Sequence, residues 1–384
     1  MHILILPSGY PTEDAPLRSI FFKEQAVALK EAGHNVGVIY SETRRITNMN
    51  YKSLKRNHFQ VSFNNENGVN TIRLHGWNIL MMRNFLGVNL WVKQTLMLYN
   101  KYVEKYGVPD IIHVHCGLYG GLAAKIIKDK YSIPYVITEH SSNILNHLLN
   151  DYDKKILSVA YNKADMLISV GEKLKSSMKS YTTNDVIVIP NIVDTNGFKI
   201  FNEKRDRFRF VTIANLKKEK RVDLIIEVFN KLLENNSNIE LVIGGKGPEF
   251  SKLEELVTKY NLHNKVKLLG EVQREDLPKI MGDSDCFVLA SKYETFGVVY
   301  IEALSCGVPI IATKCGGPED FFDDSLGYMI NIDDFDELYN SMEKMIKNRF
   351  KFNSKEISDK IKNRFSKNVI VEELEKIYKM IKLK

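Results

Sequence analysis

Short apolar runs alternate with amphipathic helical stretches along most of this 384-residue chain. In the first half, the runs ILIL, NVGVIY, DIIHVH and PYVIT are short enough to be buried strands. Between the first two, FFKEQAVALKEAG has apolar residues at helical spacing and ends on Gly33, a residue typical of a helix C-terminus. Strands separated by helices predict parallel sheets with right-handed crossovers. The chain is therefore expected to be an α/β protein.

A second series of the same kind begins at RFRFVTIAN and continues through IELVIGG, KVKLLG, DCFVLAS and VPIIAT. The segment IPNIVDTNGF between the two series has no clear periodicity, and we interpret it as a linker. Two doubly wound, Rossmann-like domains are predicted over residues 1–190 and 191–366, and a last helix over 367–384 is expected to pack back on the first domain. Ligands bind beyond the carboxyl ends of the strands in such sheets, so two domains facing each other would hold a ligand in the cleft between them.

The net charge of +7 lies mostly in the first half, where residues 1–195 carry 22 Lys and Arg against 16 Asp and Glu. This excess fits an anionic membrane surface or an acidic ligand, and it also fits solubility alone. No basic and aromatic array indicates a nucleic-acid partner. The four cysteines lack metal-ligand spacing, and no apolar window reaches about 18 residues. We expect a cytoplasmic protein, with peripheral contact at the inner face of a membrane left open. The oligomeric state is not indicated.

Residues 77–106 are rich in Trp, Met, Leu and Tyr, with scattered Lys and Arg. Two interpretations fit this composition. The segment is either a long helix packed on a core, or an amphipathic surface near a membrane or a greasy acceptor.

The stretch ETFGVVYIE places Glu294 and Glu302 at the two ends of an apolar segment. A helix is predicted to begin near residues 296–297 and to end at Gly307, which puts the two acids about 12 Å apart along its axis. That spacing exceeds the roughly 5–9.5 Å of a glycoside hydrolase acid pair. It favours binding the two ends of an elongated, hydroxyl-rich ligand, with phosphate at the helix N-terminus between them. A nucleotide sugar has this layout.

The E-x7-E motif, preceded by SKY and followed by ALSCGVPIIATKCGG, resembles the family-4 retaining glycosyltransferases, which have the GT-B fold. Further motifs resemble that family in the same order: GYP…SIFFKEQAVALKEAGHNV, TEHSS, IPNIVD and LVIGGKGPE. The resemblance covers nearly the whole chain. It implies an acceptor-binding domain over residues 1–190 and a nucleotide-sugar-binding domain over 191–366.

By this resemblance, Glu294 contacts hydroxyls of the donor sugar and Glu302 holds the ribose hydroxyls. Lys220 clamps the pyrophosphate, although in its basic run it could equally be an exposed lysine. His140 lies beside the donor sugar on the acceptor side, although a lone strand-end histidine is otherwise more often structural. The remaining donor-binding candidates are Asn215, Arg221, Gly245, Gly247, Val272, Thr295, Phe296, Gly297 and Arg18, and the remaining acceptor-side candidates are Tyr10, Ser141, Ser142 and Asn143.

Two positions depart from the family pattern, and both concern phosphate binding. Asn215 stands where the family usually has arginine, five residues before Lys220, and Ser19 stands where many members have glycine. A neutral amide is a weaker phosphate partner than a guanidinium. Arg18 is expected to compensate, with Arg221 as the second candidate.

These features predict a retaining glycosyltransferase that moves a hexose or N-acetylhexosamine from a nucleoside-diphosphate sugar, with UDP favoured, to a glycan or lipid-linked hydroxyl. A role in bacterial cell-surface polysaccharide synthesis is expected. No cofactor and no metal are expected, because cationic side chains would stabilise the leaving diphosphate. Two alternatives remain open at this point. One is a catalytically weak binding or chaperone subunit of this fold, and the other is a nucleotide-sugar epimerase or phosphorylase.

Overall fold

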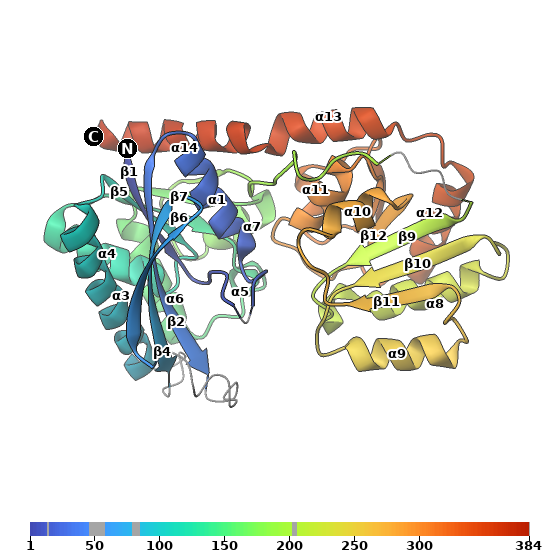
Figure 1. Cartoon of the computed structure of the whole chain (residues 1–384), viewed down its shortest axis with the longest axis horizontal. Coiled ribbons are helices and arrows are strands. Elements are labelled where there is room, and N and C mark those ends of the chain that lie inside the picture. Colours follow the sequence, from blue (N-terminus) through green and yellow to red (C-terminus); the bar gives the residue numbers. More distant parts are fainter. Residues whose placement is uncertain (14, 46–57, 79–84, 202–205, 384) are drawn as a thin grey trace. The chain divides into compact units, whose positions relative to one another are not determined.

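The computed structural model describes the chain except for residues 14, 46–57, 79–84, 202–205 and 384 (Figure 1). The chain forms two compact units, of which the first comprises Met1–Ile192 with Ile370–Lys384 and the second comprises Val193–Val369. Each unit contains one sheet with helices packed against it, as the alternation of apolar runs predicts.

The sheet of the first unit has the strand order β3-β4-β2-β1-β5-β6-β7-β8. Every described pair in it is parallel except β3 with β4. Its strands are β1 (His2–Pro7), β2 (Asn35–Arg45), β3 (Gln60–Glu66), β4 (Val69–Asn78), β5 (Ile111–His115), β6 (Tyr135–Glu139), β7 (Met166–Ser169) and β8 (Val186–Val188). Its helices are α1 (Ile20–Glu31), α3 (Phe85–Tyr106), α4 (Gly120–Tyr131), α5 (Ser142–Leu145), α6 (Asp151–Lys163) and α7 (Glu172–Met178).

The hairpin of β3 and β4 is a feature that the apolar runs do not predict. Asn67 and Gly68 form its turn, with φ angles of 54° and 84°. Two positive φ angles are typical of a type I′ turn, for which Asn-Gly is a preferred pair. Most of β3 is exposed or half-buried, so it lacks the apolar run that marks the buried strands.

For residues 85–106, which form helix α3, the structure decides between the two interpretations of segment 77–106. Eight of its residues are buried, so this helix packs on the core of the first unit. Phe85 and Leu86 at its beginning are 62% and 60% exposed. Residues 79–84 lie outside the described part of the chain.

Helix α14 (Lys367–Lys382) contributes its later residues to the first unit. Its buried side chains join a core built largely from β1, β2 and α1, and they are Ile370, Val371, Leu374, Tyr378 and Ile381. Polar contacts add to this packing, because Glu375 accepts a bond from His34 at 3.0 Å and Lys382 donates to Asp110 at 3.1 Å. The C-terminal segment is therefore part of the first unit although it follows the second in sequence.

The second unit is a fully parallel six-stranded sheet among its described strand pairs, with the order β11-β10-β9-β12-β13-β14. Its strands are β9 (Phe208–Ile213), β10 (Ile239–Gly244), β11 (Val266–Gly270), β12 (Cys286–Leu289), β13 (Ile310–Thr313) and β14 (Gly327–Ile330). Its helices are α8 (Val222–Leu232), α9 (Phe250–Lys259), α10 (Leu277–Gly282), α11 (Val298–Ser305), α12 (Phe335–Lys347) and α13 (Ser354–Phe365). The last strand, β14, is not among the predicted ones.

Each sheet contains one point at which the strand order reverses. In the first unit this point lies between β1 and β5, and in the second it lies between β9 and β12. At such a point the loops that follow two neighbouring strands run in opposite directions, which leaves a crevice at the carboxyl edge of the sheet where ligands bind.

Candidate active site

The predicted donor-binding residues of the second unit all follow strands of its parallel sheet. Asn215, Lys220 and Arg221 come after β9, Gly245 and Gly247 after β10, Val272 after β11, and residues 294–297 after β12. Because these strands are parallel, their carboxyl ends meet at one edge of the sheet, on either side of the reversal between β9 and β12.

Two of the predicted residues contact each other directly. The Nζ of Lys220 lies 2.6 Å from Oε1 of Glu294, and Ser291 donates a hydrogen bond to the same oxygen at 2.8 Å. The Lys220 and Glu294 side chains are only 20% and 12% exposed, so each charge is partly removed from water. In this form of the protein the proposed phosphate clamp is neutralised by the proposed sugar-binding acid.

The second acid of the motif has a partner that the sequence analysis missed. Glu302 is 4% exposed, and its carboxylate pairs with the guanidinium of Arg274. The Arg274 guanidinium also lies 4.8 Å from the centre of the Phe198 ring. Arg274 follows β11 at the same edge of the sheet, but it lies 28 residues before Glu302, so no local signal in the sequence pairs the two.

The helix of the motif is shorter than the sequence suggests. Helix α11 begins at Val298 after Gly297, whose φ is +89°, so Glu302 is on the helix while Glu294 precedes it. The helical rise of 1.5 Å per residue therefore applies to only part of the span between the two acids, and the 12 Å expected from a continuous helix does not describe their separation.

Asn215 and Arg221, the two candidate phosphate ligands beside Lys220 in the sequence, have different surroundings in the structure. Asn215 is exposed. Arg221 adopts φ 50° at the beginning of α8, and its guanidinium pairs with Asp223 at 3.2 Å and with Asp333. Asp333 in turn pairs with Lys292 at 2.7 Å. The charge of Arg221 is thus shared with two carboxylates of its own unit.

The two glycines after β10 are required by close backbone packing. A Cβ on Gly245, whose φ is +135°, would lie 1.8 Å from the carbonyl oxygen of Ala214. A Cβ on Gly247 would lie 2.4 Å from that of Leu216, whose N–H donates to the Lys246 carbonyl at 2.9 Å. These contacts lock the loop after β10 to the loop that carries Asn215, which accounts for both glycines without a ligand.

The other candidates of this edge differ in exposure. Phe296 is 1% exposed and packs against Phe321 and Phe365, with ring centres 5.9 and 5.6 Å away. Val272 is 9% exposed, and Thr295 is half-buried. Phe296 is therefore part of the core of the second unit, and in this structure it offers no surface to a ligand.

In the first unit, His140 follows β6 and its ring is surrounded by other aromatic groups. Its Nε2 lies 3.1 Å from Nδ1 of His115, and the rings of Phe22 and Phe21 lie 4.8 and 5.3 Å away. Burial first, and the neighbouring His113 second, lower the pKa of His140 to about 3. The His140 imidazole is therefore neutral near pH 7 and can form hydrogen bonds without carrying a charge.

The acceptor-side candidates near His140 are not equally accessible. Ser142 and Asn143 are exposed, and Ser141 is half-buried at the beginning of α5. Tyr10, by contrast, is fully buried, and the Arg73 guanidinium lies 5.0 Å from the centre of its ring. The Tyr10 side chain has no exposed surface with which to contact an acceptor in this form.

Arg18 is exposed in the loop between β1 and α1, and the next residue, Ser19, has a left-handed φ of 51°. A Cβ on Gly9 in the same loop would lie 2.7 Å from Oγ of Ser19. A positive φ is the conformation that glycine adopts most readily, which explains physically why a glycine would fit the position of Ser19.

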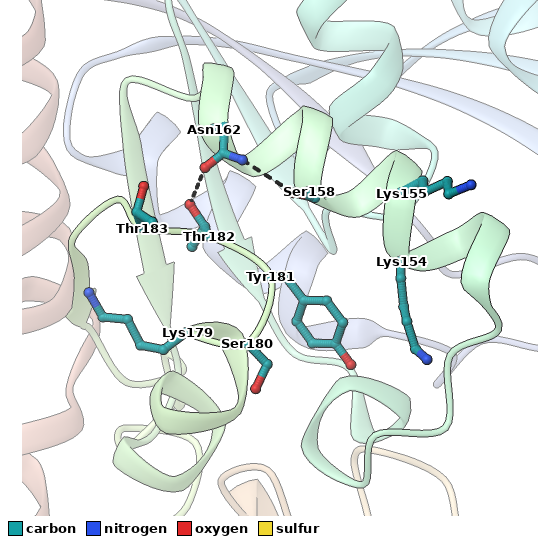
Figure 2. A pocket seen from close by; sticks show the side chains of 9 residues that line it. All are labelled: Lys154, Lys155, Ser158, Asn162, Lys179, Ser180, Tyr181, Thr182 and Thr183. Carbon is teal, nitrogen blue, oxygen red and sulfur yellow. Dashed lines mark hydrogen bonds between the residues drawn. The ribbon is translucent and has the colours of Figure 1, made fainter.

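A pocket of about 460 Å³ in the first unit lies apart from all of these residues (Figure 2). It is lined by Lys154, Lys155, Ser158, Asn162 and residues 179–183, from α6 and the segment between α7 and β8. Its polar groups already bond to one another, because Thr182 donates to Asn162 at 2.7 Å and Asn162 donates to Ser158 at 3.2 Å (Figure 2). None of the predicted site residues lines it.

Among the described residues, no group of three or more His, Cys, Asp or Glu side chains is arranged to hold a metal ion. Of the D-x-D sequences in the chain, that of Asp283 and Asp285 precedes β12, at the amino end of that strand, and Asp285 accepts a bond from the Arg209 backbone at 2.8 Å. In the part of the chain that the structure describes, no helix has the length and apolar character needed to cross a membrane.

Comparisons with known proteins cover both units. A family model described as Glycosyltransferase Family 4 matches residues 19–196, and one described as Glycosyl transferases group 1 matches residues 193–369. The phosphatidylinositol N-acetylglucosaminyltransferase GPI3 subunit of Saccharomyces cerevisiae is 30% identical over 193 residues, which are 47% of this chain and 43% of that protein. The match thus covers less than half the length of the yeast protein.

Two solved structures resemble nearly the whole chain. Sucrose-phosphate synthase from Thermosynechococcus elongatus has a TM-score of 0.80 at 18% identity and covers 99% of both chains. Anabaena HepE, solved in complex with UDP and glucose, has a TM-score of 0.72 at 19% identity and covers 98% of both chains. At these identities the likeness establishes the fold, and it confirms the predicted GT-B class.

The packing of the glycine loop gives a stability prediction. Gly245→Ala should lower the free energy of unfolding by at least about 3 kcal/mol, because the new methyl group meets a backbone carbonyl at an unfavourable φ. Gly270→Ala is the matched control, since its φ is +68° but a Cβ there meets nothing within 4 Å. It should cost only about 1 kcal/mol. Urea unfolding of both variants checks this, and equal losses would refute the packing explanation.

Two histidines of the first unit, His113 and His140, give a pH prediction. Burial lowers the pKa of His113 and of His140 to about 3, whereas an unfolded histidine titrates near 6.5. The unfolded chain therefore binds the extra protons, so this stability is fully present above about pH 6.5 and is lost as the pH falls toward 3. Urea unfolding at pH 7, 6 and 5 should show a fall of up to about 1.4 kcal/mol per pH unit for each histidine. His140→Gln should reduce the slope by about one proton, and a profile that stays flat down to pH 5 would contradict the prediction.

Proposed function

Because the chain belongs to the group 1 and family 4 glycosyltransferases, whose models match its two halves, we propose that it is a retaining hexosyltransferase. It moves a hexose or N-acetylhexosamine from a UDP-sugar to a hydroxyl of a glycan or lipid-linked acceptor. HepE, which was solved with UDP, supports the nucleotide, and the name of the yeast relative supports an N-acetylglucosamine donor and a lipid acceptor. We assign the reaction to bacterial surface-polysaccharide synthesis at the cytoplasmic face of the membrane, where the basic excess of residues 1–195 would be attracted.

The observation that carries this proposal is the pair of ion pairs at the carboxyl edge of the second sheet. Lys220 bonds to Glu294, and Arg274 bonds to Glu302. A ligand with hydroxyls at both ends and a diphosphate between them could bond to all four charged groups. Its hydroxyls would donate to the two carboxylates, and its phosphate oxygens would bind the two cations. A nucleoside-diphosphate sugar is such a ligand, with its ribose assigned to Glu302 and its sugar to Glu294.

The residues of the second unit supply the electrostatics that the reaction needs. As the bond between the anomeric carbon and the phosphate oxygen breaks, the carbon gains positive character and the leaving diphosphate gains negative charge. Lys220 and the backbone amides at the beginning of α11 would stabilise that diphosphate. This assigns charge neutralisation to side chains rather than to a resident metal ion.

Retention follows when the acceptor attacks from the face that the diphosphate leaves. The acceptor oxygen forms its bond to the anomeric carbon, and its proton passes to the leaving phosphate oxygen, so atoms and charges balance. His140, neutral because of its lowered pKa, is assigned to the acceptor side together with Ser141, Ser142 and Asn143. Exclusion of water from the reacting carbon would suppress hydrolysis.

A second candidate function has one specific observation in its favour. Asn215 stands where the family usually has arginine, and Arg221 is already shared between Asp223 and Asp333. A site with one cation fewer at the phosphate than the family usually has could bind a nucleotide sugar without transferring it efficiently. This is the catalytically weak binding or chaperone subunit considered above.

The proposed reaction is tested by incubating the chain with UDP-sugars and glycan or lipid-linked acceptors. Proton NMR of the fresh product should show the anomeric configuration of the donor, and EDTA should leave the rate within about twofold. An inverted product would exclude the retaining mechanism. An absolute need for added Mg²⁺ or Mn²⁺ would show that side chains do not suffice to stabilise the diphosphate.

Substitution of the two acids should separate their roles. Glu302→Ala should raise the dissociation constant of free UDP at least tenfold, which corresponds to about 1.4 kcal/mol. Glu294→Ala should leave UDP affinity equal or tighter, because it frees Lys220, while it lowers kcat by at least tenfold. Glu234→Ala, which removes an exposed acid in the turn after α8, is the control. Titration calorimetry and initial rates check both effects, and equal loss of UDP binding in both variants would refute the two-ended assignment.

The presence of Asn215, where the family usually has arginine, predicts that restoring the arginine improves nucleotide binding. Asn215→Arg should tighten UDP binding by about tenfold, because a guanidinium replaces a neutral amide as a phosphate partner, whereas Asn215→Gln should not.

Arg221→Ala should change kcat/KM less than threefold because its charge is committed to Asp223 and Asp333, and Arg18→Ala should lower kcat/KM at least tenfold. A tenfold loss on Arg221→Ala would make Arg221 the missing cation. Tight UDP binding without transfer in every variant would favour the weak subunit.

A further inference from the structure

Glu139 is a buried carboxylate that the proposed reaction does not use. It is the last residue of β6 and is 0% exposed. Its Oε1 accepts backbone N–H bonds from His140 at 2.9 Å and from Ser141 at 3.0 Å. Its Oε2 accepts the backbone N–H of Gly117 at 2.9 Å and the hydroxyl of Tyr161 at 2.7 Å.

Both carboxylate oxygens of Glu139 act as acceptors, with two donors on each. An isolated buried charge costs several kcal/mol, and the hydrogen bonds offset that cost. Burial, and then the Glu139 carboxylate, raise the pKa of Tyr161 well above its ordinary value, so this phenol keeps the proton that it donates. The four donors thus form a binding site for an anion, and the anion is the Glu139 side chain.

The three backbone donors come from the loops after β5 and β6, two neighbouring strands of the first unit, whereas Tyr161 donates from α6. Gly117 lies in the loop after β5, where Cys116 and Tyr119 have positive φ angles of 66° and 65°. Non-glycine residues hold such angles only when their surroundings fix them. His140 and Ser141 begin the loop after β6. Glu139 thus ties together two neighbouring loops at the edge where ligands bind in sheets of this kind.

The ring of His140 is fixed by separate contacts. One of the His115 and His140 rings donates to the other at 3.1 Å, and Phe22 stacks on His115 with ring centres 4.4 Å apart. Glu139 therefore holds the backbone from which His140 and Ser141 project, while His115 holds the imidazole.

We propose that Glu139 is a positioning residue for the transfer reaction, which fixes the backbone of His140 and Ser141 so that the acceptor side is preorganised. The inference rests on the proposed function, because it takes His140 and Ser141 to act on the acceptor side. Loss of the Glu139 charge should affect the chemical step and leave nucleotide binding, which is assigned to the second unit, unchanged.

The test compares Glu139→Gln with Tyr161→Phe. The first turns an N–H₂ group toward backbone donors, whereas the second removes one donor of the carboxylate without altering either loop's backbone bonds. Glu139→Gln should lower kcat at least tenfold with the UDP dissociation constant within twofold of wild type. Tyr161→Phe should lose stability but keep kcat within about threefold. Equal losses of kcat in both variants, in proportion to their loss of stability, would show a merely structural role and overturn the proposal.

A readout independent of turnover keeps the test decisive. Hydrogen exchange at the amides of Gly117, His140 and Ser141 should be slow in the wild type and in Tyr161→Phe, and at least tenfold faster in Glu139→Gln. Unchanged exchange overturns the proposal. If the wild type transfers no sugar, the proposed function fails, yet the exchange rates still decide whether Glu139 fixes these loops. Should Glu139→Gln not fold, Glu139→Asp keeps the charge on a shorter side chain, so a lower kcat with unchanged UDP binding supports the proposal and full activity overturns it.

Discussion

Parallel pairing of β9 with both β10 and β12 sends the loops after these strands to one edge of the second sheet. This constraint brings together Lys220 and Glu294, which are 74 residues apart in sequence, and Arg274 and Glu302, which are 28 apart. The glycines after β10 let two of the loops pack backbone to backbone. The loops that carry the charged groups are therefore fixed by packing and by ion pairs with one another, which is what a preorganised site requires.

The two ion pairs explain how the charges at this edge can be stable on their own and still exchange their contacts for those of a ligand. A partly buried charge without a partner is costly, so each acid of the motif is satisfied by a cation of the same site. A donor that supplies hydroxyls and a diphosphate can replace those contacts with equivalent ones. The binding free energy is then the difference between the site with its ion pairs intact and the site bonded to the donor. Both sets of contacts involve charges, so the ionic strength of the buffer should affect both.

The sequence predicts the buried strands and the motif residues because these signals are local. The β3 and β4 hairpin is missed because neither strand is a continuous apolar run, although Asn67 and Gly68 mark its turn. Contacts distant in sequence could not be predicted. Arg221 is a phosphate-ligand candidate from its place beside Lys220, but the fold pairs it with Asp333. Tyr10 is an acceptor-side candidate by resemblance, but the fold buries it beside the Arg73 guanidinium. Arg274 and Glu139 acquire their roles only from partners that the fold brings to them.

The central claim is that the carboxyl edge between β9 and β12 binds the nucleotide sugar. A crystal structure of the chain with UDP or a non-hydrolysable UDP-sugar tests it directly. The account predicts ribose hydroxyls within hydrogen-bond distance of the Glu302 carboxylate and a diphosphate oxygen on Nζ of Lys220, with the Lys220–Glu294 contact opened. A nucleotide bound in the pocket between α6 and residues 179–183, with both ion pairs unchanged, would contradict it.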